Sequence, residues 1–151
     1  MTLKNLLAEG RVRTQKTSAN EIGDLLRVVD RDMADARVEE ISTDRRFATA
    51  YNAALQLATI AICAAGYRVV GKNHHWTTFN VLPEILGPKS VARTNYFDQC
   101  RSKRNVSDYD RAGEISENEV EEIISETEKF RKEIMVWMKR NHPALWLKGT
   151  K

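Results

Sequence analysis

The segment TDRRFATAYNAALQLATIAICAAGYR, residues 43–68, constrains the fold more than any other part of the chain. From Phe47 to Ala65 it is apolar on nearly every side of a helix, and its charged residues gather at its N-terminal end. A helix that is apolar all round must be covered by other elements, so the segment predicts a central helix. Gly66 suits the position just after its last turn. One side carries mostly alanine, which lets a neighbouring helix approach closely.

The first and last long segments also have helical patterns with clear start signals. Ser18 is followed three residues later by Glu21, and apolar residues then recur at helical spacing for about five turns. Ser116 and Glu119 form a second such pair, followed by a long apolar stripe that ends before Pro143. We therefore expect two long amphipathic helices packed on the central one.

Residues 66–90, which follow the central helix, are broken by three glycines and two prolines. The region between the central and last helices predicts a short helix near 76–86 and a further helix over about 90–103. Strand-like alternation of useful length is absent from the sequence. The predicted fold is therefore all-α, an antiparallel up-and-down helical bundle with additional short helices, formed by a single domain over residues 1–151.

Length and composition limit the class of protein. A chain of 151 residues with 42 % hydrophobic and 30 % charged residues can fold as one globular domain. The opening residues have too short an apolar run for a signal peptide, and no run approaches the ~18 apolar residues of a membrane span. Cys63 and Cys100 match no metal or redox spacing. We expect two core thiols in a cytoplasmic protein without membrane contact.

Charge is distributed unevenly along the chain. Residues 89–111 carry a net charge of +3, whereas residues 114–133 carry −5, with eight glutamates against three basic residues. A basic segment followed by an acidic helix favours a local anion site over a general coating of nucleic acid. Scattered, solvated charge is the alternative interpretation.

Common catalytic signatures are absent from the sequence. It has no glycine-rich phosphate loop, paired-cysteine zinc motif, nucleophile elbow or His-Glu-x-x-His motif. His74 and His75 are adjacent, whereas two metal ligands on a helix normally lie three or four residues apart. We expect one of them to pack against or cap the short helix beginning near Trp76, and we expect neither a metal nor a cofactor.

The stretch CRSKRNVSDYDRAG, residues 100–113, has no apolar rhythm that explains its composition. Arg101 and Arg104 share one face of a helix because they are three residues apart, and two guanidinium groups suit a phosphate. The candidate phosphate- or nucleic-acid-binding residues are Arg101, Lys103, Arg104, Asn105 and Tyr109. In the alternative interpretation, the arginines pair internally with an aspartate or with the glutamates of the last helix.

Residues 44–140 resemble the HEPN domain family. The resemblance rests on the order of the central helix, the loop KNHHW, a helix, RSKRNVSDYD and a long last helix. It implies a HEPN-like core over about 18–142 in a small helical bundle that usually dimerises. Many HEPN domains are metal-independent ribonucleases, whose motif is an arginine, a polar residue, and a histidine four to six positions beyond the arginine.

The resemblance assigns Arg104 to the motif arginine and Asn105 to its polar residue, while Tyr109 holds the position of the expected histidine. In active members the arginine binds the scissile phosphate, the histidine assists proton transfer and the ribose 2′-OH attacks. Some subfamilies have an Asp-Tyr pair at this place, as here. A tyrosine with a pKa of ~10 is a poor general base at neutral pH, so phosphate binding survives this replacement more readily than cleavage.

Three functional hypotheses follow. The first is a homodimeric, HEPN-like protein that binds RNA or a nucleotide, within a toxin–antitoxin or phage-defence module. The second is a metal-independent endoribonuclease toxin with Arg104, Asn105 and Tyr109 as its catalytic residues. The third is a structural or interaction bundle without nucleic-acid binding. The resemblance also suggests a nucleotidyltransferase-type antitoxin as a partner.

Overall fold

The computed structural model describes residues 2–109 and 115–146, and for residues 105–109 it describes the backbone alone. Within these ranges the chain is largely helical, which confirms the predicted all-α helical bundle. Its helices are α1 (Leu3–Ala8), α2 (Ala19–Ala36), α3 (Thr43–Ala64), α4 (His74–Leu86), α5 (Val91–Tyr109) and α6 (Glu117–Asn141). Two short strands, β1 (Val12–Thr14) and β2 (Tyr67–Val69), and two 3-10 turns, Pro88–Ser90 and Pro143–Leu145, complete the described elements.

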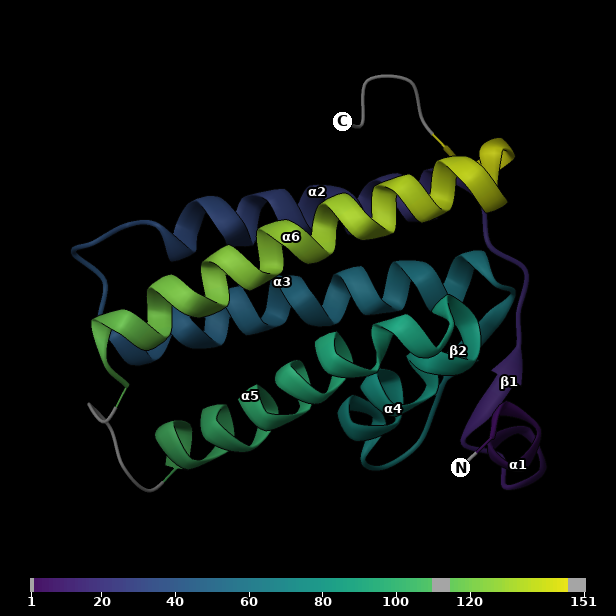
Figure 1. Cartoon of the computed structure of the whole chain (residues 1–151), viewed down its shortest axis with the longest axis horizontal. Coiled ribbons are helices and arrows are strands. Elements are labelled where there is room, and N and C mark those ends of the chain that lie inside the picture. The colour runs from purple at the N-terminus through teal and green to yellow at the C-terminus, as the bar shows by residue number, and fades with distance from the viewer. Residues whose placement is uncertain (1, 110–114, 147–151) are drawn as a thin grey trace.

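Helix α3 is the central element, as its composition predicts. Helices α2 and α6 lie along one side of α3, and α4 and α5 lie on the other (Figure 1). The small residues Ala50, Ala54 and Ala58 are fully buried, because backbones approach closely where side chains are small. Helix α3 is long and apolar enough to cross a membrane by length and composition, but 72 % of its apolar window is buried within the bundle. Such burial is typical of a core helix.

The helix boundaries agree with the start and stop signals in the sequence. The Ser18 hydroxyl accepts a hydrogen bond from the backbone N–H of Glu21. Ser116 and Glu119 form the expected reciprocal capping box. Gly66 follows the end of α3 with a φ of 94°, a left-handed conformation that favours glycine.

Two boundaries differ from the prediction. Helix α4 begins at His74, so one of the two histidines starts the short helix. Helix α5 extends to Tyr109, about six residues beyond the predicted end. The backbone of residues 100–109 is therefore helical, whereas the last residues of the 100–113 stretch lie outside the described residues.

The sequence did not predict the two-stranded sheet. Strand β1 pairs antiparallel with β2, with Val12 opposite Val69 and Thr14 opposite Tyr67. Three residues are too few for a recognisable alternation of apolar and polar side chains. The pairing attaches the N-terminal segment to the end of the bundle where α3 finishes (Figure 1).

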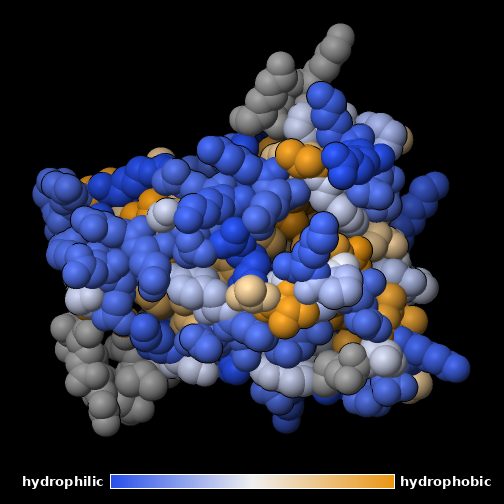
Figure 2. Space-filling model, in the orientation of Figure 1, coloured by the Kyte–Doolittle hydropathy of each residue, from blue (hydrophilic) through white to orange (hydrophobic). Residues whose placement is uncertain are grey.

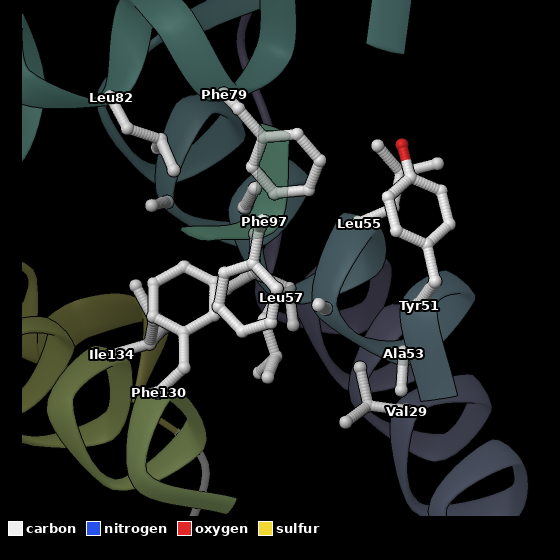
Figure 3. Close-up of a cluster of buried hydrophobic side chains, with 14 of the residues drawn as sticks. Val29, Tyr51, Ala53, Leu55, Leu57, Phe79, Leu82, Phe97, Phe130 and Ile134 are labelled. Carbon is white, nitrogen blue, oxygen red and sulfur yellow. The ribbon is translucent and has the colours of Figure 1, made fainter. Parts of the chain in front are cut away.

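A row of aromatic rings connects four helices through the core (Figure 3). The ring centroids of Tyr51 and Phe79 are 5.9 Å apart, those of Phe79 and Phe97 are 5.8 Å apart, and those of Phe97 and Phe130 are 5.2 Å apart. These residues come from α3, α4, α5 and α6 in turn. Aromatic pairs at such separations contribute packing energy beyond their buried area.

Arg46 is a charged residue in the core. Only 5 % of its side chain is exposed, and its Nε donates to the backbone carbonyl of Ala36 at 2.8 Å. Its Nη1 donates to the Glu117 carboxylate at 3.0 Å. Arg46 thus joins the end of α2, the start of α3 and the start of α6. The carbonyl of Ala36 depends on this bond because the residue is fully buried.

We expect Arg46→Met to lower the free energy of unfolding by about 1–3 kcal/mol, because it leaves the buried Ala36 carbonyl without this donor while keeping most of the side-chain volume. Arg45→Met, at the neighbouring exposed position, is the matched control and should change stability by less than about 0.5 kcal/mol. Urea unfolding followed by circular dichroism measures both. Equal stability of the two variants would show that the buried bond contributes nothing.

Candidate functional site

The three described cations of the 100–113 stretch, Arg101, Lys103 and Arg104, lie just past the middle of α5. Arg101 and Arg104 are on one face, as their spacing predicts, and Lys103 lies apart from them. Asn105 and Tyr109 belong to the helix, but their side chains lie outside the described residues. The predicted roles of these two residues therefore stay predictions.

Arg104 packs on an aromatic ring of the central helix. Its guanidinium carbon lies 5.6 Å from the ring centroid of Tyr51, within the range of a cation–π interaction. The Tyr51 residue is 1 % exposed, so the ring belongs to the core while its hydroxyl points out of the apolar cluster (Figure 3). The contact brings the predicted phosphate-binding stretch of α5 onto the central helix α3.

The Tyr51 hydroxyl lies 3.2 Å from Nδ1 of His75, in the first turn of α4. This distance fits a hydrogen bond in which either group donates, depending on the tautomer of His75. His75 is half-buried, and its ring packs against those of Tyr51 and His74 at centroid distances of 5.8 and 4.5 Å. One of the two histidines was expected to pack against or cap the short helix; instead both lie within α4, and His75 packs against Tyr51 of α3.

Burial and the arginine charges shift the pKa values of Tyr51 and His75. Burial raises the pKa of Tyr51 above its ordinary value, against the opposing effect of the Arg104 and Arg101 charges. Burial and the neighbouring His74, Arg104 and Arg101 lower the pKa of His75 to about 4. At neutral pH the tyrosine is therefore protonated and the histidine is neutral. We call Tyr51, His75, Arg101 and Arg104 the arginine–tyrosine–histidine cluster.

Part of the alternative interpretation, internal ion pairing, is also present in the structure. Nε of Arg101 donates to the Asp98 carboxylate at 3.0 Å, within the same helix. Lys103 pairs with Glu119 of α6 at 2.6 Å, and this bond raises the pKa of Lys103 and lowers that of Glu119. Lys103 is therefore engaged with the acidic last helix and is the weakest of the described candidates for phosphate binding.

Sequence reasoning missed Tyr51 and His75 as members of this site. A tyrosine in an otherwise apolar helix was one available signal, because a buried Tyr hydroxyl usually finds a polar partner. The histidine pair in KNHHW is visible in the sequence, but spacing alone does not show which ring turns toward the bundle. Their juxtaposition depends on the packing of α4 against α3.

Two hollows of the protein are lined by none of the four residues of this cluster. One of about 280 Å³ lies between α2, α3, β2 and α4, and includes Cys63, whose burial raises the pKa of its thiol to about 11. A larger groove of about 590 Å³ lies between α5 and α6, on a surface that is largely hydrophilic with scattered hydrophobic areas (Figure 2). Both cysteines are buried, free thiols, as expected. Across the part of the chain that the structure describes, no group of three or more metal-binding side chains comes together.

Comparison with protein-family models, with curated proteins and with solved structures finds no match to this chain.

We expect the imidazole of His75 to titrate with a midpoint near pH 4 in NMR spectra of the folded protein. Arg104→Gln should move that midpoint upward, because it removes a cation that disfavours the protonated ring, and Arg101→Gln should do so to a smaller extent. Arg27→Gln on α2, where the arginine side chain is 72 % exposed, is the charge-matched control. A midpoint near 6.5 that none of these variants moves would contradict the described cluster.

The lowered pKa of His75 makes the stability of the protein depend on pH. Since His75 binds a proton less readily in the folded chain than in the unfolded one, the free energy of unfolding falls as the pH drops from about 6.5 toward about 4. His75→Gln should remove this part of the pH dependence. Comparing urea unfolding of the native protein and the variant at each pH isolates it from the carboxylates.

Proposed function

We propose that the protein is a HEPN-like RNA- or nucleotide-binding protein that holds phosphate at the arginine–tyrosine–histidine cluster. One observation carries the proposal: Arg104 lies 5.6 Å over the ring of Tyr51, whose hydroxyl lies 3.2 Å from His75. The contact places a cationic group of the predicted binding stretch against a fixed aromatic ring. It also adds a histidine that sequence spacing alone did not connect with the arginines.

The chemistry of the cluster suits a phosphate oxygen. Guanidinium groups present several N–H donors in a planar fork that matches phosphate geometry. Stacking on Tyr51 restrains Arg104, so less side-chain freedom is lost when an anion binds. With the Tyr51 hydroxyl donating to Nδ1, the neutral His75 ring carries its proton on Nε2 and can donate that proton to an anion.

Partial burial strengthens these interactions. Only 25 % of the Arg101 side chain is exposed. A charge in such surroundings interacts more strongly with an anion than one in bulk water does. The pairing of Arg101 with Asp98 reduces its net charge but leaves the other donors of the guanidinium to a ligand. Phosphate binding is therefore compatible with the internal pair.

RNA as the ligand, and a toxin–antitoxin or phage-defence module as the setting, rest on the resemblance to HEPN domains. The arginine of the cluster, Arg104, is the residue that matches the motif arginine of that family. Homodimerisation, a cytoplasmic location and a nucleotidyltransferase-type antitoxin as partner belong to the same proposal. The arrangement of the cluster supports the phosphate-binding part of it.

Binding of a fluorescently labelled single-stranded RNA, measured by anisotropy over a series of salt concentrations, tests the proposal. We expect Arg104→Ala to weaken binding about tenfold or more, and Arg101→Ala to weaken it less, because each removes charged hydrogen bonds to phosphate. The slope of log affinity against log salt should fall by about 0.7 for each phosphate that the variant no longer neutralises.

Arg27→Ala is the control for this experiment, since it removes the same charge from an exposed position on α2. It should leave affinity within about twofold. Circular dichroism of each variant checks that the fold is intact. Native-like affinity and an unchanged salt slope in both cluster variants would refute phosphate binding at this site.

Metal-independent RNA cleavage is the second candidate function, and the position of His75 favours it. In the tautomer with Nδ1–H donating to the Tyr51 oxygen, Nε2 of His75 can accept a proton. A bound phosphate would raise the low pKa of His75 by supplying negative charge beside it, which brings the ring closer to the range of a useful general base. His75 on α4 would then take the role of the motif histidine, whose position in the sequence is held by Tyr109.

If this second function is correct, the native protein cleaves single-stranded RNA in the presence of EDTA, and His75→Gln lowers the rate by about 100-fold or more while binding is retained. His142→Gln, at the end of α6, is the matched control and should cleave as the native protein does. Binding without cleavage by the native protein would restrict the function to recognition.

A further inference from the structure

An open pocket of about 420 Å³ adjoins the arginine–tyrosine–histidine cluster, and Arg101 belongs to both. Its lining residues are Arg11, Asn73, Trp76 and Arg101. They come from the segment before β1, the start of α4 and the middle of α5, which are far apart in the sequence. A pocket of this size is within the range of small-ligand sites.

Arg11 and Trp76 form a cation–π pair in this pocket, with the guanidinium over the ring. The Arg11 guanidinium carbon lies 4.9 Å from the centroid of the Trp76 ring. Nη2 of Arg11 donates to the Thr77 hydroxyl at 2.8 Å, and Thr77 is fully buried, so the guanidinium is held in place from below. Glu9 lies 3.6 Å from Nη1 and is itself half exposed. The pair is thus a preformed platform.

The other two lining residues, Asn73 and Arg101, supply further polar groups to the pocket. Asn73 is exposed and has a left-handed backbone conformation with a φ of 58°, which asparagine tolerates better than most residues. Its amide offers both a donor and an acceptor. Arg101 supplies a second guanidinium to the pocket, and its charge helps to lower the pKa of His75.

We propose that this pocket binds the base of a nucleoside phosphate, with the base stacked on the Arg11–Trp76 platform and the phosphate on Arg101. Bases stack on aromatic side chains and on guanidinium planes, and the amide of Asn73 can pair with a base edge. The pocket deepens the proposed function and rests on it, because Arg101 would hold the same phosphate there.

The occupant must have an accessible base. A base inside a duplex is already stacked on its neighbours and cannot lie on a protein platform without being extruded. A free nucleotide and a nucleotide of single-stranded RNA both meet this requirement, since they share the base, ribose and phosphate. The pocket therefore favours either of them over duplex RNA.

Titration calorimetry with AMP, ribose 5-phosphate, a short single-stranded RNA and a duplex of the same sequence tests the inference. We expect AMP to bind about 5- to 100-fold more tightly than ribose 5-phosphate, because only AMP has a base to stack. The single strand should bind more tightly than the duplex. If AMP binds more tightly than RNA, the ligand of the pocket is a free nucleotide. If RNA binds more tightly, the ligand is single-stranded RNA.

Two variants test the platform itself. Trp76→Leu removes the aromatic ring, and Arg11→Lys keeps the charge but removes the planar guanidinium. Each should abolish most of the preference for AMP over ribose 5-phosphate while leaving ribose 5-phosphate affinity within about twofold. Arg27→Lys is the matched control and should behave as the native protein does.

Equal affinities for AMP and ribose 5-phosphate, or a preference that both platform variants retain, would overturn the inference. If RNA binding still depended on Arg101 and Arg104 in that case, the proposed function would stand and the base pocket alone would fail. If none of the four ligands bound to the native, folded protein, both the proposed function and the pocket would be refuted.

Discussion

The burial of α3 is the constraint on which the rest of the structure depends. A 22-residue helix with apolar side chains on nearly every side loses stability unless it is covered all round, so α2, α4, α5 and α6 must pack on it. Alanines on its surface let these neighbours approach closely. Arg46, a buried charged residue of this helix, lies in its first turn and bonds to the end of α2 and the start of α6.

Tyr51 connects this core with the candidate site. Its ring belongs to the aromatic row that reaches Phe130 through Phe79 and Phe97. Its hydroxyl points away from this row and lies 3.2 Å from Nδ1 of His75. A side chain anchored in a packed core has little freedom, so Arg104 stacks on a fixed ring. The rigidity of the site thus comes from the same packing that stabilises the bundle.

The basic residues of α5 face two different neighbours. Glutamates of α6 neutralise Lys103 and also Arg93, which pairs with Glu126 and Glu133 at 2.5 and 2.9 Å. Arg101 instead faces α4 and the N-terminal segment, where it lines a pocket with Arg11. Arg101 and Arg11 have acidic partners of their own, Asp98 at 3.0 Å and Glu9 at 3.6 Å, but two guanidinium groups meet on this side of α5, which favours an anion there. The overall net charge of +3 does not show where along the chain the basic residues lie.

The sequence by itself determined the helical class, the central position of residues 43–64, the caps at Ser18 and Ser116, and the shared face of Arg101 and Arg104. Each of these follows from spacing within one segment, because helix periodicity and capping act over a few residues. Tertiary structure decided the short β1–β2 pairing, the hydrogen bond between Tyr51 and His75, which lie 24 residues apart, and the meeting of Arg11, Trp76 and Arg101. These contacts join different elements, and their geometry depends on how each helix is rotated and placed against α3, which no local pattern encodes.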